Sequence, residues 1–342
     1  MKIFIVGGHD MPNLESGKIS GGLQFCVQMH VDILSEYHDV TIFTPADSYP
    51  FERCHTMLSS VASFKDDDEH KSSKIKTRNK EIENALSNEQ YDLVIVHSYI
   101  ISTHIVCANS NAKSVILFQH VTPANLGGIA SFHKINAVMD AYKNGAITVL
   151  PSKSCVDQWI PFVQKLQKNY PEHFTKNKDS DILDSIKYYS YPFSTVEEFP
   201  VLDESDGTIV AVTRLRKEKK VNLAISIAKK YKLKLKLVCP KIVTEEEQTL
   251  AALYRKTFDL DIIEDVSRER VLQEIAKSNR MLVSSNQESF CIVAAEAAMC
   301  GIPIITPMAK DYYPAPMEAS NTSESQLIDK DTTVIDITPI PY

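Results

Sequence analysis

Two glutamates are the residues of this 342-residue chain whose type and spacing best suit a functional site. Glu288 and Glu296 lie eight positions apart within the stretch Ser284–Pro307. One interpretation is purely structural: Glu288 favours the dipole at a helix N-terminus, and Glu296 is a solvated helix residue. The neighbours of Glu296 argue against it, because they are apolar on both sides. Such a helix is expected to be buried, and a buried carboxylate needs a partner.

The elements around this pair are predicted to be a strand, a loop, a helix and a second strand. Arg280–Ser285 is short, apolar and bounded by polar residues, which is typical of a buried strand. A helix is predicted to follow Ser289 and to end at Gly301, which suits a C-terminal cap, and Ile304–Thr306 is the next strand. Glu288 is thus expected in the loop at the carboxyl end of a strand, where open α/β sheets bind ligands.

A basic loop could supply the complementary charge. The segment Thr213–Lys220 carries five cationic side chains directly after the predicted strand Thr208–Val212. Arginine and lysine in this position could hold a diphosphate. Charge alone does not distinguish such a clamp from a solvated turn, so both interpretations stay open.

Glycines and histidines mark the corresponding places in the first half of the chain. The predicted strand Lys2–Val6 is followed by a long loop that ends in Gly21 and Gly22, just before a helix. Backbone amides at a helix N-terminus could bind a phosphate or a sugar hydroxyl, although paired glycines also serve turn geometry alone. His97 and His120 each end a predicted strand. A histidine in that position is often structural, so the residues alone leave its role open.

Two blocks of opposite charge follow in the same half. Asp66–Glu69 is acidic and Lys71–Lys80 is mostly basic, a pattern that favours a solvated, mobile loop. The alternative is a loop that faces an acceptor and contacts phosphates through Lys74, Lys76 and Arg78.

The alternation of short apolar runs with helical patterns predicts an α/β fold with two doubly wound domains. The chain is also too long for one typical core. Turn residues in Tyr188–Pro200 place the boundary there. We expect a first domain at residues 1–192, a second at residues 193–320, and a polar tail at residues 321–342 that could cross back to the first domain.

Composition argues against several classes of protein. The formal net charge of −7 argues against a generic nucleic-acid coat, and no apolar run is long enough for a transmembrane helix. Ser154–Tyr170 mixes apolar residues with lysines, but Pro161 breaks its pattern, so packing is favoured over a membrane interface. The first residues, MKIFIVGGHD, resemble no signal peptide, so we expect a cytoplasmic protein, in the host cytoplasm if it is viral. Seven cysteines without a CxxC pair predict reduced thiols, and we expect no metal site.

The order and spacing of these motifs resemble the retaining family-four glycosyltransferases with the GT-B fold, over roughly Met1 to Pro307. The resemblance implies two Rossmann-like domains that face each other across a cleft. It implies that Glu288 and His120 contact the donor sugar and that Glu296 holds the ribose hydroxyls of the nucleotide. It also implies catalytic or donor-binding roles for a further set of residues: Gly21, Gly22, Arg214, Lys219, Ser289 and Phe290.

The chain departs from this pattern in a few places. Ser289 and Cys291 stand where the family usually has glycines, and Lys220 stands where glycine or asparagine is more usual. After Pro303 the chain lacks the Gly-rich turn and the long helices that are usual in the family, which leaves the role of its tail open.

The implied reaction is a metal-independent transfer, with retention of configuration, from a nucleoside diphosphate sugar to a hydroxyl group. We expect a UDP-sugar as donor and no cofactor. Leu117–His120 (LFQH) resembles a string in bacteriophage enzymes that glycosylate hydroxymethylated DNA bases, so such DNA is the expected acceptor. A cell-envelope lipid or oligosaccharide is the alternative.

The sequence alone is also compatible with other classes of protein. A GT-B sugar-nucleotide epimerase and a non-catalytic nucleotide-sugar binder are both compatible with the motifs. A glycoside hydrolase could also use two carboxylates, but Glu296 lies inside a predicted helix and the basic loop would then have no purpose. The sequence does not indicate an oligomeric state.

Overall fold

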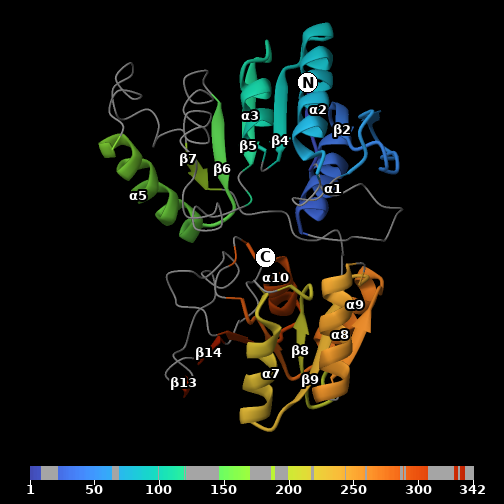
Figure 1. Ribbon diagram of the computed structural model, residues 1–342, viewed down its shortest axis with the longest axis vertical. Coiled ribbons are helices and arrows are strands. Elements are labelled where there is room, and N and C mark those ends of the chain that lie inside the picture. The colour runs from blue at the N-terminus through green and yellow to red at the C-terminus, as the bar shows by residue number, and fades with distance from the viewer. Residues whose placement is uncertain are drawn as a thin grey trace. The chain divides into compact units, whose positions relative to one another are not determined.

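The computed structural model describes residues 1–8, 22–63, 69–98, 100–118, 120, 146–169, 186–188, 199–216, 219–242, 244–258, 260–285, 288, 290–306, 327–329 and 332–335. The chain forms two compact units and passes from the first to the second between Pro192 and Phe193. Each unit is built around one sheet with helices packed on it (Figure 1).

The first unit contains a seven-stranded sheet in the order β3-β2-β1-β4-β5-β6-β7, with every neighbouring pair parallel. Its strands are β1 (Lys2–Val6), β2 (Asp39–Thr44), β3 (His55–Leu58), β4 (Leu93–His97), β5 (Ser114–Phe118), β6 (Ile147–Leu150) and β7 (Ile186–Tyr188). Its described helices are α1 (Gly22–Ser35), α2 (Lys71–Asn88), α3 (Ile101–Ala108) and α5 (Lys153–Asn169). The strand order reverses between β1 and β4, as in a doubly wound dinucleotide-binding sheet.

The second unit repeats this order and then extends it. Its sheet runs β10-β9-β8-β11-β12-β14-β13, and the first five strands are parallel. The strands are β8 (Thr208–Val212), β9 (Lys234–Cys239), β10 (Asp261–Glu264), β11 (Arg280–Leu282), β12 (Ile304–Thr306), β13 (Leu327–Asp329) and β14 (Thr332–Ile335). The described helices are α7 (Val221–Lys230), α8 (Glu245–Phe258), α9 (Arg268–Lys277) and α10 (Ile292–Met299).

Both sheets have buried central strands, because helices cover parallel sheets on both faces. Ile3, Phe4, Ile5 and Val6 of β1 are all fully buried. In the second unit, β8 has the same continuous apolar character, and its residues pack against α7 and α9. The short apolar runs that predicted strands are therefore the centres of the two cores.

The prediction of a loop at Lys71–Lys80 is wrong, because these residues form the first half of α2. The buried face of this 18-residue helix consists of Arg78, Ile82, Ala85 and Leu86. Their spacing is that of one helix face, but its first member is an arginine. The apolar pattern therefore becomes visible only in the second half of the helix, and the charges of the first half concealed it.

The helix α5 is continuous through Pro161, where the sequence predicted a break. Proline removes one backbone hydrogen bond and usually kinks a helix, but packing can maintain the helix on both sides. Cys155 and Trp159, in the turns before Pro161, are buried. This burial supports the packing interpretation of the segment.

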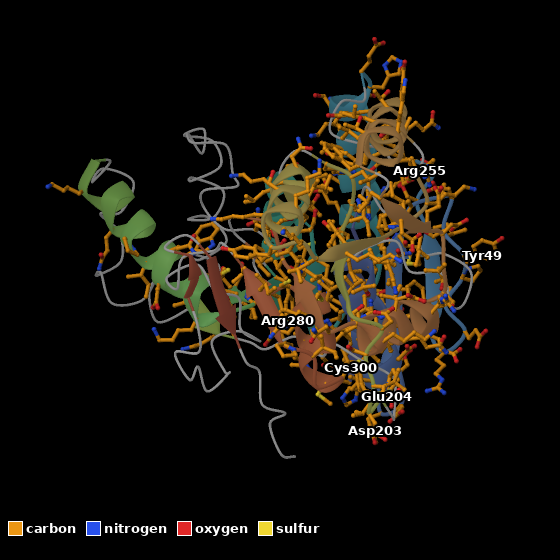
Figure 2. The ribbon with its side chains drawn as sticks, turned by 90° about the horizontal axis from the view of Figure 1, so that it is seen from below. Tyr49, Asp203, Glu204, Arg255, Arg280 and Cys300 are labelled. Carbon is orange, nitrogen blue, oxygen red and sulfur yellow. The ribbon has the colours of Figure 1, made fainter. Side chains whose placement is uncertain are left out.

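The described part of the tail joins the second sheet. β14 pairs antiparallel with β12, with Ile304 opposite Ile335, and β13 pairs antiparallel with β14. These residues therefore do not cross back to the first unit. Figure 2 labels Asp203, Glu204 and Cys300, which precede strands of this sheet, and Arg280, the first residue of β11; these residues mark its amino-terminal edge.

Candidate active site

Two loops meet at the point where the strand order of the second sheet reverses. Adjacent strands β8 and β11 are parallel, so both loops leave from the same edge. The loop after β8 contains Arg214 and Lys219, and the loop after β11 contains Glu288. Such a switch point is where open α/β sheets bind ligands, because the connections diverge to opposite faces and leave a crevice.

An ion pair joins these two loops. Lys219 Nζ donates to Glu288 Oε1 at 2.6 Å, and the two side chains are 30% and 16% exposed. Ser285 Oγ donates to the same carboxylate oxygen at 2.5 Å, and Ser284 Oγ donates to the backbone carbonyl of Lys219 at 2.7 Å. The basic loop and the first glutamate, both predicted from the sequence, are thus held in contact by two adjacent serines.

The helix α10 starts immediately after this ion pair. Cys291, its N-cap, has a left-handed backbone with φ of 60°, and Phe290 is buried. Burial, and next the charge of Glu288, raise the pKa of the Cys291 thiol well above its usual range. Cys291 is therefore a neutral thiol beside the Glu288 carboxylate. The positive φ also gives a physical reason for glycine at this position in the resembling family.

The second glutamate is almost completely buried in α10. Glu296 is 1% exposed and forms an ion pair with Arg268, the first residue of α9. Burial lowers the pKa of the Arg268 guanidinium to about 10, so it remains a cation at neutral pH. Within the described residues, Glu296 Oε2 accepts no hydrogen bond. The expectation that a buried Glu296 needs a partner is met by Arg268.

The cationic side chains of the basic loop have different surroundings. Arg216 lies 3.8 Å from Glu247 of α8, and buried Leu215 anchors the loop in the core. Arg214, on the other side of Leu215, is half-exposed. Lys220 has a left-handed backbone with φ of 47° at the start of α7, where the family prefers glycine or asparagine. The pattern of the loop is therefore that of an anchored turn with Arg214 and Lys219 beside the switch point.

In the first unit, His120 belongs to a chain of buried histidines. His97 Nδ1 lies 3.0 Å from His120 Nε2, and His97 Nε2 lies 3.0 Å from His30 Nδ1. The three rings come from α1, from the end of β4, and from the segment just after β5. His97, whose role the sequence left open, is thus the central member of this chain.

The other residues that the sequence predicted for the site lie in several different places. Gly22 was predicted as the last residue of the loop before the helix and is instead the first residue of α1, whereas Gly21 and Ser289 lie outside the described residues. Lys74 and Lys76 lie on α2, half-exposed and exposed respectively.

The interpretation of Arg78 as an acceptor contact does not fit its surroundings. Its side chain is buried, and its guanidinium donates to the carbonyls of Gly7 at 2.9 Å and Gly8 at 3.2 Å. It also lies over the ring of Phe43. Arg78 therefore holds the chain at the carboxyl end of β1.

Sequence reasoning missed several residues of these arrangements. Ser284 and Ser285 were assigned to the strand before Glu288, but that strand ends at Leu282, which frees both hydroxyls for the loop. Arg268 could have been found from the need of Glu296 for a cation. His30 could have been noticed as a polar residue among apolar ones on the helix after Gly22.

The described part of the chain offers neither a metal site nor a membrane-spanning helix. No group of three or more histidine, cysteine, aspartate or glutamate side chains is placed there to hold a metal ion. No helix among those residues is both long enough and apolar enough to cross a membrane.

Comparison with known proteins gives the class of this chain. Residues 194–316 match the model of the family described as "Glycosyl transferases group 1". No curated protein matches the chain. Solved structures do resemble it in fold, and all those described next are 14% identical or less.

Sucrose-phosphate synthase (tll1590) from Thermosynechococcus elongatus has a TM-score of 0.64 at 14% identity, covering 89% of this chain and 80% of that chain. The catalytic domain of starch synthase IV from Arabidopsis thaliana, bound to ADP and acarbose, has a TM-score of 0.63 at 11% identity, covering 96% and 86%. Alr3699/HepE from Anabaena, in complex with UDP and glucose, has a TM-score of 0.55 at 14% identity, covering 89% and 80%.

Residues 194–316, most of the second unit, are thus similar to the group 1 glycosyltransferases, and the chain has the two-domain α/β fold of the GT-B glycosyltransferases. The protein is a glycosyltransferase.

Proposed function

We propose that this protein transfers a sugar from a nucleoside diphosphate sugar to an acceptor hydroxyl group, with retention of configuration and without a metal ion. The observation that carries the proposal is the contact between Lys219 and Glu288 at the switch point of the second sheet. A cation for a diphosphate and a carboxylate for sugar hydroxyls stand next to each other there, within the region that matches the family.

The leaving group sets the first requirement of this reaction. When the bond between the anomeric carbon and the diphosphate oxygen breaks, its electron pair stays on the diphosphate. Lys219 and Arg214 would stabilise that negative charge, as preorganised donors do at other developing anions. Lys219 can take this role because its bond to Glu288 is partly exposed and can be replaced by bonds to phosphate oxygens.

The sugar sets the second requirement. Positive charge develops at the anomeric carbon, and Glu288, once Lys219 turns to the diphosphate, is free to accept hydrogen bonds from sugar hydroxyls. His120 is the proposed second contact to the sugar. The acceptor oxygen then attacks from the face that the diphosphate leaves, and its proton passes to the leaving phosphate oxygen. This route needs no covalent intermediate with the protein.

For the nucleotide, we propose uridine diphosphate and a role for Glu296 at the ribose. The Anabaena structure contains UDP, whereas the Arabidopsis structure contains ADP, so the fold alone does not choose the base. Glu296 Oε2 has no hydrogen bond to the described residues, and a ribose hydroxyl would satisfy it. Arg268 would keep this carboxylate charged while it accepts that bond.

For the acceptor, we propose a hydroxymethylated pyrimidine in DNA. The support is the resemblance of Leu117–His120 to the DNA-modifying enzymes, together with the exposed side chains of Lys76 and Lys80 on α2. We expect the double variant Lys74→Ala, Lys76→Ala to weaken a DNA acceptor and to leave donor turnover unchanged, because phosphate contacts are electrostatic. The double variant Lys229→Ala, Lys230→Ala on α7 removes the same charge elsewhere and is the control.

The deciding experiment is a donor panel of UDP-, GDP-, ADP- and dTDP-sugars with hydroxymethylcytosine DNA and with plain DNA. Released nucleotide and modified nucleosides are measured by mass. A mass gain on hydroxymethylated DNA alone supports the acceptor. Nucleotide release without a DNA product rejects DNA as acceptor and moves the search to cell-envelope lipids and oligosaccharides.

The same panel separates the other classes of activity. A new nucleotide sugar with no released nucleotide identifies an epimerase, and donor binding without turnover identifies a non-catalytic binder. Either result would reject the proposed transfer.

A further inference from the structure

Three histidines form a continuous hydrogen-bonded chain at the carboxyl edge of the first sheet. His97 is fully buried and bonds with both of its ring nitrogens, while His30 and His120 are 7% and 8% exposed. The two ring nitrogen separations are both 3.0 Å, which is the length of a hydrogen bond. His97 thus links His30, on α1, to His120, in the segment just after β5.

All three rings are neutral at pH 7. Burial lowers the pKa of His30 to about 4. Burial, followed by the neighbouring rings of His30 and His104, lowers the pKa of His120 to about 3. Burial and the two flanking histidines hold the pKa of His97 well below its usual value.

The neutral state couples the three rings. A neutral imidazole has one N–H donor and one acceptor nitrogen. Because His97 uses both nitrogens, it must donate to one neighbour and accept from the other. If its Nδ1 donates to His120, then His30 Nδ1 donates to its Nε2, and His120 carries its proton on Nδ1. If the direction is reversed, all three protons sit on Nε2.

Aromatic packing also fixes the orientation of the rings. The ring of Phe118 stacks on His97, with centroids 4.6 Å apart and planes inclined by 17°. The ring centroids of Phe118 and His30 are 5.0 Å apart. Packing therefore fixes the ring of His97, and the hydrogen bond couples the tautomer of His120 to that of His97.

We propose that His30 and His97 are positioning residues that hold His120 in a single tautomer and orientation for its contact with the donor sugar. This inference rests on the proposed function, since the sugar contact of His120 belongs to it. Neither His30 nor His97 would touch the substrate. Their effect would pass through His120, because only a defined tautomer presents the sugar with a defined donor or acceptor.

The first test needs no substrate. Nitrogen NMR of the full-length protein with ¹⁵N-labelled histidine reports the charge and tautomer of each ring. We expect His30, His97 and His120 to be neutral at neutral pH and to share one tautomer. In the variant His97→Phe, which keeps a flat ring but removes both nitrogens, His120 should become a mixture of tautomers. A charged His97 ring in the wild type, or an unchanged His120 in the variant, would overturn the proposal.

The second test measures transfer. His97→Phe and His30→Phe should lower kcat roughly 10- to 100-fold, the usual effect of losing a group that orients a catalytic one. Their Kd for UDP should stay within about twofold, since the diphosphate loop belongs to the other unit. The control is His104→Gln, because His104 is equally buried but bonds through Nε2 to the Ser98 carbonyl at 2.6 Å, which an amide can replace.

The outcomes separate this inference from the function on which it rests. An active wild type with fully active His97→Phe and His30→Phe variants overturns the positioning role and leaves the transferase intact. A wild type that transfers from no donor overturns the proposed function, and the NMR result then still decides whether the tautomers are coupled. If His97→Phe does not fold, His30→Phe and the wild-type spectra carry the test.

Discussion

Under the proposed function, the carboxylate of Glu288 would have two competing partners, the Lys219 ammonium and the sugar hydroxyls. In the structure, Lys219 and Ser285 share its Oε1 oxygen. In the proposed reaction, the diphosphate would attract Lys219, and the carboxylate would become available to the sugar. A neutral amide at this position would keep the shape but lose the charge that attracts lysine and binds hydroxyls strongly.

Glu288→Gln is therefore expected to reduce sugar transfer by about 100-fold or more, the usual cost of removing one preorganised polar group. The measurement is nucleotide release at saturating donor. Glu264→Gln is the matched control, because Glu264 forms an ion pair with Arg255 at 2.8 Å on the exposed surface of the same unit. Full activity of the Glu288 variant would reject the site assignment.

Two arginines of one loop carry the same charge but have different surroundings, so their variants separate the effect of position from that of charge. Arg214 and Arg216 are separated only by buried Leu215, but Arg216 lies near Glu247 of α8. We expect Arg214→Ala to abolish transfer and weaken UDP binding, and Arg216→Ala to change both by less than about threefold. Binding is measured by calorimetry and transfer by nucleotide release. Equal losses in the two variants would mean that the loop acts only through its total charge.

At the scale of elements, two helices end with the same hydrogen-bond motif but with different residues. After α7, Leu233 N donates to Ala228 O and Lys232 N to Lys229 O, and Lys232 has φ of 53°. After α10, Ile302 N donates to Ala297 O and Gly301 N to Ala298 O, and Gly301 has φ of 72°. Both are Schellman caps, which favour glycine at the left-handed position.

The two caps predict opposite effects of exchanging the residue. Lys232→Gly should raise the free energy of unfolding by about 1 kcal/mol, and Gly301→Ala should lower it by a similar amount, because a Cβ atom is strained at positive φ. Urea unfolding of both variants measures this. A control is Lys229→Gly inside α7, which should destabilise. A destabilised Lys232→Gly variant would contradict the assignment of strain to this position.

The elements that local pattern specifies were predicted well. β1, β8 and β12 have the bounds that the sequence indicated, and α10 is followed by the predicted glycine cap, Gly301. Each of these depends on a short apolar run or on a cap that lies within a few residues. The positions of Glu288 and Lys219 follow from the same alternation, since strand ends define the functional edge.

The remaining features depend on contacts between distant residues, so local pattern could not reveal them. The first half of α2 is stabilised by Arg78 bonding to Gly7 and Gly8, some 70 residues earlier. β14 is a strand because β12 offers it an edge. The histidine chain joins three elements, and no single one of them contains a motif.

At the scale of the whole molecule, the two units lose different charges as the pH falls. In the second unit, Lys236 is buried and donates to Asp206 at 2.8 Å and to Glu274 at 2.7 Å. Burial raises the pKa of Asp206, but hydrogen bonds from Lys236 and Thr208 outweigh it and bring the value to about 2. This contribution to stability is present above the ordinary pKa of 3.8 and is lost only as the pH falls toward 2.

The first unit responds to milder acid because its buried histidines must stay neutral. Burial lowers the pKa of His30 and of His104 to about 4 and that of His120 to about 3. The unfolded chain binds protons near the ordinary value of 6.5, whereas the folded unit does not. Stability is therefore complete above pH 6.5 and is lost as the pH falls from there through the folded values.

We accordingly expect the first unit to lose stability between about pH 6.5 and pH 4, before the second unit does, at roughly 1.4 kcal/mol per pH unit for each neutral histidine. Trp159, the chain's one tryptophan, lies in the first unit, so its fluorescence during urea unfolding reports that unit. His30→Phe should flatten the pH dependence, because it removes one of the groups that must stay unprotonated. A urea midpoint that stays constant from about pH 7 to about pH 5 would mean that the histidines bind protons in the folded unit. The three histidines would then be hydrated instead of buried.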